Sequence, residues 1–181
     1  MIRRFRASRL APLAGALALI LAGLSLAPGA GEAQDKTRGT GLPLPRFVSL
    51  KSDNVNVRRG PGQEYEVGFT FVRADLPVEI TQEFDNWRKI RDSEGAEGWV
   101  FHSLLAGKRT ALVAPWDKSG PFPAYASADP EAAVVAYLEP KVIAAVEQCT
   151  GTWCEISVQD YDCWIEQDRL WGVYPDEQFE E

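Results

Sequence analysis

Three cysteines and one histidine carry the most reactive side chains of this sequence. Because His102 is the only histidine, a metal site with two histidine ligands is excluded, and no cysteine or carboxylate motif surrounds it. A cysteine–histidine hydrolase would need this histidine to approach Cys149, Cys154 or Cys163, and nothing in the sequence brings them together. We therefore expect no catalytic residues, no metal and no cofactor, and interpret His102 as a surface residue after a strand.

The spacing of the cysteines favours a structural disulfide instead. Cys149 and Cys154 enclose the hairpin-like connection Thr150 to Trp153, which could place the two sulfurs within bonding reach. In an oxidising compartment such a pair tends to be linked, and so short a loop would add on the order of 2 kcal/mol of stability. Cys163 is then left over. We expect it to be a buried free thiol; the alternatives are a Cys154–Cys163 bond or a link between molecules.

The elements that must position these residues are short strands separated by turns. Val78 to Thr81 alternates apolar and polar side chains, as the two faces of a strand require. Asp85-Asn86 predicts a hairpin turn into a strand at Trp87 to Ile90. Ser93 to Ala96 predicts a second turn into a strand at Gly98 to Phe101. Four or five such strands within about 55 residues predict a small all-β barrel or sandwich.

An internal repeat indicates that this unit occurs twice. Trp87 recurs as Trp153 after 66 positions, and Trp99 recurs as Trp164 after 65. The further landmarks are Leu104 with Leu170, Gly107 with Gly172, and Val78 with Val142 or a register close to it. A shared offset across several landmarks predicts two copies of one fold.

One segment of the second copy is compatible with two structures. Asp129-Pro130-Glu131 followed by Ala132 to Leu138 has a capping residue and a proline at the first helical position, which alone would predict a short helix. The repeat places this segment opposite Glu64 to Val72, which has the pattern of a loop and a strand, and Pro140 would stop a helix early. We expect a loop and strand here.

The N-terminus has the pattern of an export signal. Four arginines among the first nine residues precede an apolar run from Leu10 to about Ala27, and Gly31-Glu32-Ala33 supplies small residues for cleavage. The alternative is a transmembrane anchor, which the breaks at Pro12 and Gly23 disfavour. We expect a Sec-type signal peptide, rather than a twin-arginine one, and a periplasmic or secreted protein with no membrane span after cleavage.

The charge of the chain excludes some partners. The sequence has 19 Lys and Arg against 26 Asp and Glu, a net charge of −7. Without residues 1–33, which hold four Arg and one Glu, 15 basic and 25 acidic residues remain, a net charge of −10. Nucleic acids and anionic lipids both need a positive surface, so we expect neither as a partner.

The first copy resembles a known family. The run Asp53 to Gly62, with Tyr65 behind it, resembles the opening of bacterial SH3-like (SH3b-type) domains. In that family an Asn-Val-Arg strand enters a Gly-Pro turn, and a Trp strand and a Gly-Trp strand then close the barrel. Trp87 to Ile90 and Gly98 to Val100 fit those two strands. The resemblance implies an SH3-type barrel.

The second copy resembles the same family less closely. It lacks the Asn-Val-Arg opening, has Pro123 to Ala126 instead, and carries Cys163 where the first copy has Gly98. Its closing run, Leu170 to Pro175, is similar to the end of a group of exported proteobacterial proteins with this tandem layout. The resemblance therefore implies an all-β chain of two tandem small SH3-like β-barrels. The expected parts are a signal peptide at 1–33, a flexible leader at 34–46, barrel 1 at 47–107, a degenerate barrel 2 at 108–175 and an acidic tail at 176–181.

The aromatic residues are the candidates for ligand binding. Since Trp87, Trp99, Trp153 and Trp164 fall on strands of the repeat, we expect most of their area in the cores or between the barrels; the alternative is a binding groove. The ligand-binding candidates are Tyr65, beside the Gly60 turn, Trp116, on the segment joining the repeats, and Trp87 and Trp99.

The resemblance also implies a function. We expect a non-enzymatic binding module of the periplasm or cell envelope. Its expected partner is the cell-wall polymer peptidoglycan or an extended peptide of an envelope protein. The alternative is an envelope scaffold that docks another protein and binds no wall polymer.

Overall fold

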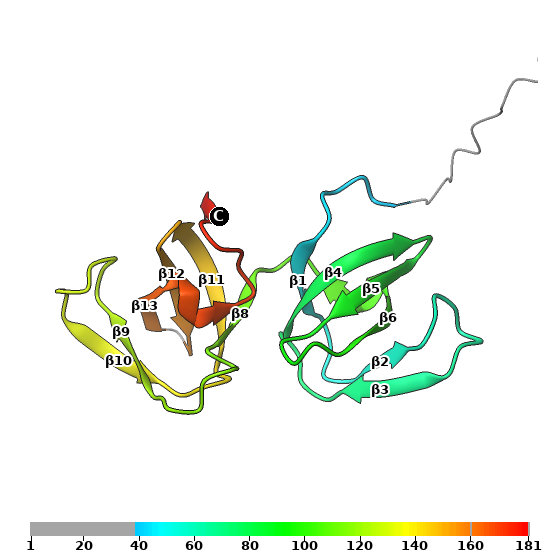
Figure 1. Cartoon of the computed structure of the whole chain (residues 1–181), viewed down its shortest axis with the longest axis horizontal. Helices are drawn as coiled ribbons and strands as arrows, with labels where there is room; N and C mark the ends of the chain where they lie inside the picture. The colour runs from blue at the N-terminus through cyan, green and yellow to red at the C-terminus, as the bar shows by residue number, and fades with distance from the viewer. Residues whose placement is uncertain (1–38, 160, 181) are drawn as a thin grey trace, which may run out of the picture. The chain divides into compact units, whose positions relative to one another are not determined.

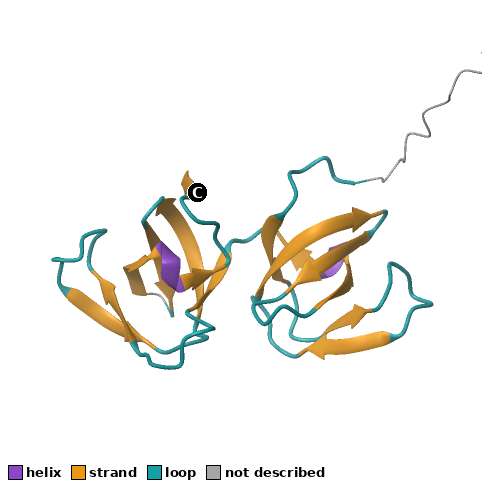
Figure 2. Cartoon of the chain, in the orientation of Figure 1, coloured by secondary structure: helices purple, strands orange, loops and turns teal. Residues whose placement is uncertain are grey.

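The computed structural model describes residues 39–159 and 161–180, so the signal peptide expected at 1–33 lies outside the described residues. The described residues belong to one compact unit. They form strands and two short 3-10 turns arranged as two antiparallel sheets, which confirms the all-β fold class (Figures 1 and 2). Within the described ranges, no helix is long and apolar enough to cross a membrane.

The first sheet contains the strands of the first repeat, in the order β3-β2-β6-β5-β4-β1-β7. Its strands are β1 (Arg46–Leu50), β2 (Val55–Arg58), β3 (Val67–Phe71), β4 (Pro77–Phe84), β5 (Trp87–Arg91), β6 (Glu97–Phe101) and β7 (Leu105–Ala106). The predicted Asp85-Asn86 turn joins β4 to β5, and Asp85 adopts the left-handed conformation, φ 47°, that Asp tolerates in tight turns. The 3-10 turn His102–Leu104 precedes β7.

The second sheet has the same layout, in the order β10-β9-β13-β12-β11-β8-β14. Its strands are β8 (Thr110–Val113), β9 (Phe122–Tyr125), β10 (Val134–Leu138), β11 (Ile143–Thr150), β12 (Trp153–Val158), β13 (Tyr161–Glu166) and β14 (Leu170–Trp171). The 3-10 turn Gln167–Arg169 precedes β14. Because each of these seven strands has a counterpart at the same place in the first sheet, the structure confirms the predicted repeat. The strand β10 confirms that residues 134–138 are not helical.

The pairing registers define one detail of the predicted repeat, which was left open to a neighbouring register, and correct another. Ile80 pairs with Ile90 and Val146 pairs with Ile156, so Val78 corresponds to Ala144 and not to Val142. The two 3-10 turns are 65 positions apart, so the counterpart of Leu170 is Leu105 and not Leu104. The error for Leu170 arose because Leu104 and Leu105 are adjacent identical residues, which the sequence alone does not distinguish as counterparts.

Each sheet encloses a mainly aliphatic core, and the part of the expectation that places the repeated tryptophans in these cores is wrong. The core of the first sheet is built from Leu50, Val55, Val57, Val78, Ile80, Ile90 and Val100. Trp87, Trp99, Trp153 and Trp164 are only partly buried and belong to neither core. Side chains alternate along a strand, so burying Ile90 and Val100 turns Trp87 and Trp99 to the opposite, outer face.

Both ends of the described chain are tied to the sheets. In the segment expected to be a flexible leader, the backbone N–H and hydroxyl of Thr40 donate hydrogen bonds to the carboxylate of Glu83. At the other end, β15 (Gln178–Glu180) lies within the expected acidic tail and pairs with β11 from Gln148 to Thr150. Neither segment is a free extension over its described residues.

Candidate binding site

The first sheet carries two of the predicted binding residues on its outer face. Trp87 packs edge-to-face on Phe101, with 5.5 Å between ring centroids. Trp99 lies on the neighbouring strand opposite Lys89 and lines a shallow recess of about 450 Å³, together with Pro61 and Phe84. The recess offers the partly exposed indole of Trp99 and the exposed side chains of Leu44 and Phe84.

Tyr65 lies beside the Gly60 turn, as predicted. Its side chain is 44% exposed, and its ring packs so closely on Gly60 that a Cβ there would lie 2.4 Å from Cδ1 of the tyrosine. Arg58 fixes this turn because its Nη1 donates hydrogen bonds to the carbonyls of Gln63 and Tyr65. The exposed ring is thus presented by a rigid turn.

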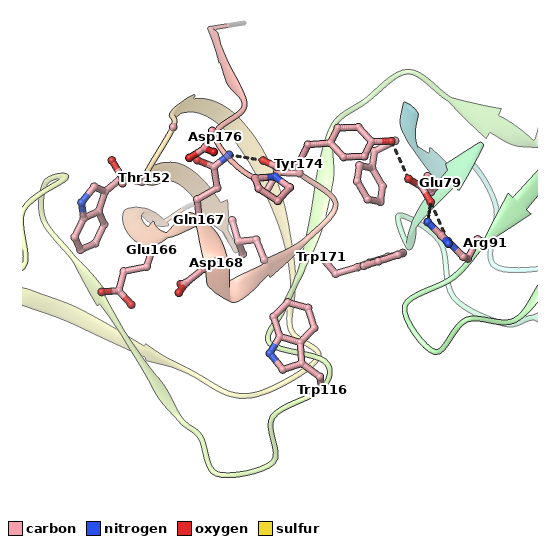
Figure 3. Close-up of a pocket in the computed structure, with 16 residues that line it drawn as sticks. Glu79, Arg91, Trp116, Thr152, Glu166, Gln167, Asp168, Trp171, Tyr174 and Asp176 are labelled. Atoms are coloured by element: carbon pink, nitrogen blue, oxygen red, sulfur yellow. Dashed lines mark hydrogen bonds and ion pairs between the residues drawn. The ribbon is translucent and has the colours of Figure 1, made fainter. Parts of the chain in front are cut away.

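Trp116 occupies a different place from the other three candidates. It was expected on a segment joining the repeats, but it lies between β8 and β9, inside the second repeat, because β8 already belongs to the second sheet. Its side chain is 57% exposed and lines a pocket of about 670 Å³ (Figure 3). The structure does not bring Trp116 into the recess that Trp99 lines.

The pocket beside Trp116 is lined mainly by the end of the second repeat. Further aromatic walls come from Trp153, Trp171 and Tyr174, and first-sheet residues Phe47, Glu79 and Arg91 complete the lining. Gln167, Trp171 and Tyr174 line the pocket but were not predicted from the sequence as site residues. Trp171 could have indicated the site from the sequence. It follows the repeat landmark Leu170, and its counterpart in the first copy is Ala106, which is not aromatic.

A set of ordered contacts holds one side of this pocket. Phe47 packs on both Trp171 and Tyr174, with ring centroids 5.2 Å and 4.8 Å away. The Tyr174 hydroxyl donates a 3.0 Å hydrogen bond to Glu79, whose other carboxylate oxygen accepts from Arg91 (Figure 3). Burial and the bond to Glu79 raise the pKa of Tyr174 well above its usual value, so the phenol stays a neutral donor.

Two buried polar atoms of the lining residues have no hydrogen-bond partner among the described residues. Gln167 is 5% exposed, and its Nε2 donates to the carbonyls of Tyr174 and Glu177 at 2.7 and 3.1 Å. Its Oε1 accepts no bond, and Nε1 of Trp171 donates none. A buried acceptor and a buried donor left unpaired are uncommon and costly in a folded protein.

The predicted disulfide is present, and the third cysteine is free. Cys149 and Cys154 face each other across β11 and β12 and are bonded, with 4.1 Å between their Cα atoms. Cys163 is buried and unbonded, as expected. Burial, with Asp162 and Glu155 nearby, raises the pKa of the Cys163 thiol, which makes it a poor nucleophile. In the described part of the chain, no three His, Cys, Asp or Glu residues gather as metal ligands would.

Comparison with known proteins places both repeats in one family. The family model described as the bacterial SH3 domain matches the chain twice, at residues 51–107 and 118–172. Two solved structures, NlpC2 and NlpC1 from Trichomonas vaginalis, are similar at 13% and 12% sequence identity, with TM-scores of 0.32 and 0.30. The matches cover 70% and 74% of this chain and 48% of each of those chains, so this chain spans about half their length. No curated protein matches it at a significant level.

Proposed function

This chain belongs to the bacterial SH3 domain family, and on that premise we propose that it is a non-enzymatic binding module of the cell envelope. Its ligand is peptidoglycan or an extended peptide, recognised through small SH3-like barrels. The observation that carries the proposal is the 670 Å³ pocket with Trp116, Trp153 and Trp171 in its lining. A concave surface that combines aromatic side chains with polar and charged groups is suited to binding a ligand.

The cysteines support a location outside the cytoplasm. A buried disulfide between Cys149 and Cys154 is compatible with an oxidising compartment such as the periplasm. The basic and apolar pattern of residues 1–33 supports export by a signal peptide. The acidic net charge of −7 supports a partner other than nucleic acid.

The second candidate function is an envelope scaffold that binds another protein and no wall polymer. The observation that favours it is the edge strand β10, where Val134, Val135 and Tyr137 are 43%, 54% and 67% exposed. An exposed apolar edge strand is a suitable surface for pairing with a strand of a partner.

Co-sedimentation of the purified protein with peptidoglycan sacculi, at low and moderate salt, tests the proposal. We expect retention in the pellet, which Trp116→Ala reduces because this ring lines the pocket and is mostly exposed. Tyr65→Ala tests whether the first repeat contributes. Tyr161→Ala is the matched control, since Tyr161 is 77% exposed and lies outside the pocket lining.

The possible outcomes separate the two functions. Protein that stays wholly in the supernatant contradicts wall binding and supports the scaffold. In that case Tyr137→Ala, on the exposed edge strand, is expected to reduce cross-linking to envelope proteins, whereas Trp116→Ala is not.

A further inference from the structure

We propose that the pocket lined by Gln167 and Trp171 binds a peptide segment that carries a basic side chain. This inference rests on the proposed function and narrows it: among wall and envelope ligands, it selects peptides with a free amine or guanidinium over glycan chains. Three features of the pocket support this inference: two unpaired polar atoms, the carboxylates in the lining, and the aromatic side chains.

The unpaired atoms match the two polar groups of a peptide bond. Oε1 of Gln167 can only accept a hydrogen bond, and Nε1 of Trp171 can only donate one. A peptide group offers an N–H to the first and a C=O to the second. Both atoms are shielded from solvent, so bulk water does not satisfy them, and a ligand that bonds them removes the cost of leaving them unpaired.

Reaching these two atoms requires the lining side chains to move. Changes of side-chain rotamer of this kind are common when a ligand binds. The Gln167 amide itself cannot turn freely, because its Nε2 is held by the carbonyls of Tyr174 and Glu177. Because Nε2 is held in this way, Oε1 is the amide atom that stays without a hydrogen bond from the described chain.

The charge of the lining favours a positively charged ligand. Glu166, Asp168 and Asp176 line the pocket, and Arg91, the one lining cation among the described residues, is already bonded to Glu79. Arg169 pairs with two of these carboxylates, with its Nε at 3.6 Å from Glu166 and 3.8 Å from Asp168. These long, exposed pairs neutralise little charge, so the pocket keeps a negative potential.

The aromatic walls suit the same ligand. The 57% exposed indole of Trp116 lines the same pocket as the Asp168 carboxylate, so a cation there can contact a ring face and a negative charge together. A glycan would also stack on tryptophan, but it brings no positive charge to the carboxylates. The combination therefore selects a basic peptide.

The test is a titration of the purified full chain, followed by tryptophan fluorescence and calorimetry, with three probes. The first is an alanyl-lysyl-alanine peptide with both ends blocked, the second is the same peptide with glutamate in place of lysine, and the third is an N-acetylglucosamine tetramer. We expect the lysyl peptide to bind in preference to the other two. Raised salt should weaken its binding because the attraction is partly ionic.

Four variants locate the site. Trp171→Phe removes the Nε1 donor but keeps an aromatic ring against Phe47, and we expect about a fivefold loss of affinity for the lysyl peptide, as for one neutral hydrogen bond. Asp168→Asn, whose side chain is 79% exposed, should cost about two- to threefold without affecting folding. Tyr161→Ala and Glu66→Gln, exposed and outside the pocket lining, are the controls and should change nothing.

The outcomes distinguish this inference from the function on which it rests. Retention on sacculi with no preference for the lysyl peptide overturns the inference and leaves wall binding intact. Unchanged affinity in both Trp171→Phe and Asp168→Asn also overturns it. If the protein binds neither sacculi nor any of the three probes, both proposals are overturned together.

Discussion

The carboxylate of Glu83 lies 3.2 Å from Nε of Arg88, at the pair of positions where the second sheet carries its disulfide. Glu83 faces Arg88 across β4 and β5 as Cys149 faces Cys154 across β11 and β12, with a bulge at the same place in both hairpins. All four side chains are buried. The two repeats thus stabilise the same cross-strand position by different means, an ion pair in one and a covalent bond in the other.

Replacing Glu83 should be strongly destabilising. Its carboxylate also accepts hydrogen bonds from Thr40 and Arg46, so Glu83→Gln leaves the buried Arg88 without its counter-charge. We expect a loss of about 3 kcal/mol in the free energy of unfolding, as for other broken buried pairs, measured by urea denaturation. Glu66→Gln is the control, because its pair with Arg59 is exposed and 4.0 Å long, and it should cost less than about 0.5 kcal/mol.

The same carboxylate should make stability depend on pH in the acid range. Burial alone would raise the pKa of Glu83, but hydrogen bonds from Arg46 and Thr40 outweigh it and lower the pKa from 4.5 to about 2. A depressed folded-state pKa stabilises the protein fully above the unfolded pKa, and this stability is lost as pH falls from about 4.5 towards 2. The stability gap between wild type and Glu83→Gln should therefore narrow over that window, and a constant gap would contradict the assignment.

Removing the disulfide should destabilise the second sheet by a moderate amount. The loop closed by Cys149 and Cys154 is short, so the expected loss for the double replacement by alanine is about 2 kcal/mol, read from the denaturant midpoint. The variant should still fold, because the rest of the second core is unchanged. A reducing agent should lower the midpoint of the wild type but not that of the variant.

The free thiol should be hidden in the native protein. Cys163 is buried and its pKa is raised, so a thiol reagent should find no reactive cysteine in the native state and one per chain after unfolding without reductant. Two or more reactive thiols in the unfolded state would show that the Cys149–Cys154 bond is missing.

The core also requires glycine at one position of the first sheet. A Cβ on Gly98 would lie 2.4 Å from a Val57 methyl and 2.9 Å from the carbonyl of Arg58. By strand register, Cys163 of the second sheet corresponds to Gly98, and the smaller Ala124 corresponds to Val57. Gly98→Ala should therefore cost about 1–3 kcal/mol. Adding Val57→Ala should recover part of this cost, and strictly additive losses in a double-mutant cycle would contradict the steric account.

The sequence was sufficient to predict the features that depend on neighbouring residues. The Asp85-Asn86 hairpin and the Cys149–Cys154 bond each follow from residues within one turn or one hairpin. The strand at 134–138 was predicted from the repeat, against a local pattern that favours a helix. The repeat offset then extended the prediction of one small β fold to two copies, and the two sheets have the same strand layout.

The features that sequence could not predict depend on distant residues. The alternation in Trp87 to Ile90 does not show which face of the strand is buried. The face that carries Arg88 is buried, and this is possible because Glu83, from another strand, neutralises the arginine. The pocket could not be predicted because Tyr174 and Glu79, which meet beside it, are 95 positions apart. No local pattern marks Gln167 as buried, since its first-sheet counterpart is the exposed His102.

The strand β15 has a consequence for how the pocket binds. The segment Val173 to Asp176 lies between β14 and β15, and both of these strands are paired into the second sheet. Arg109 adds a further tether through two 3.0 Å bonds to Glu177. The pocket wall is therefore preorganised: its loop entropy is lost when the chain folds, and the ligand does not have to order it again on binding.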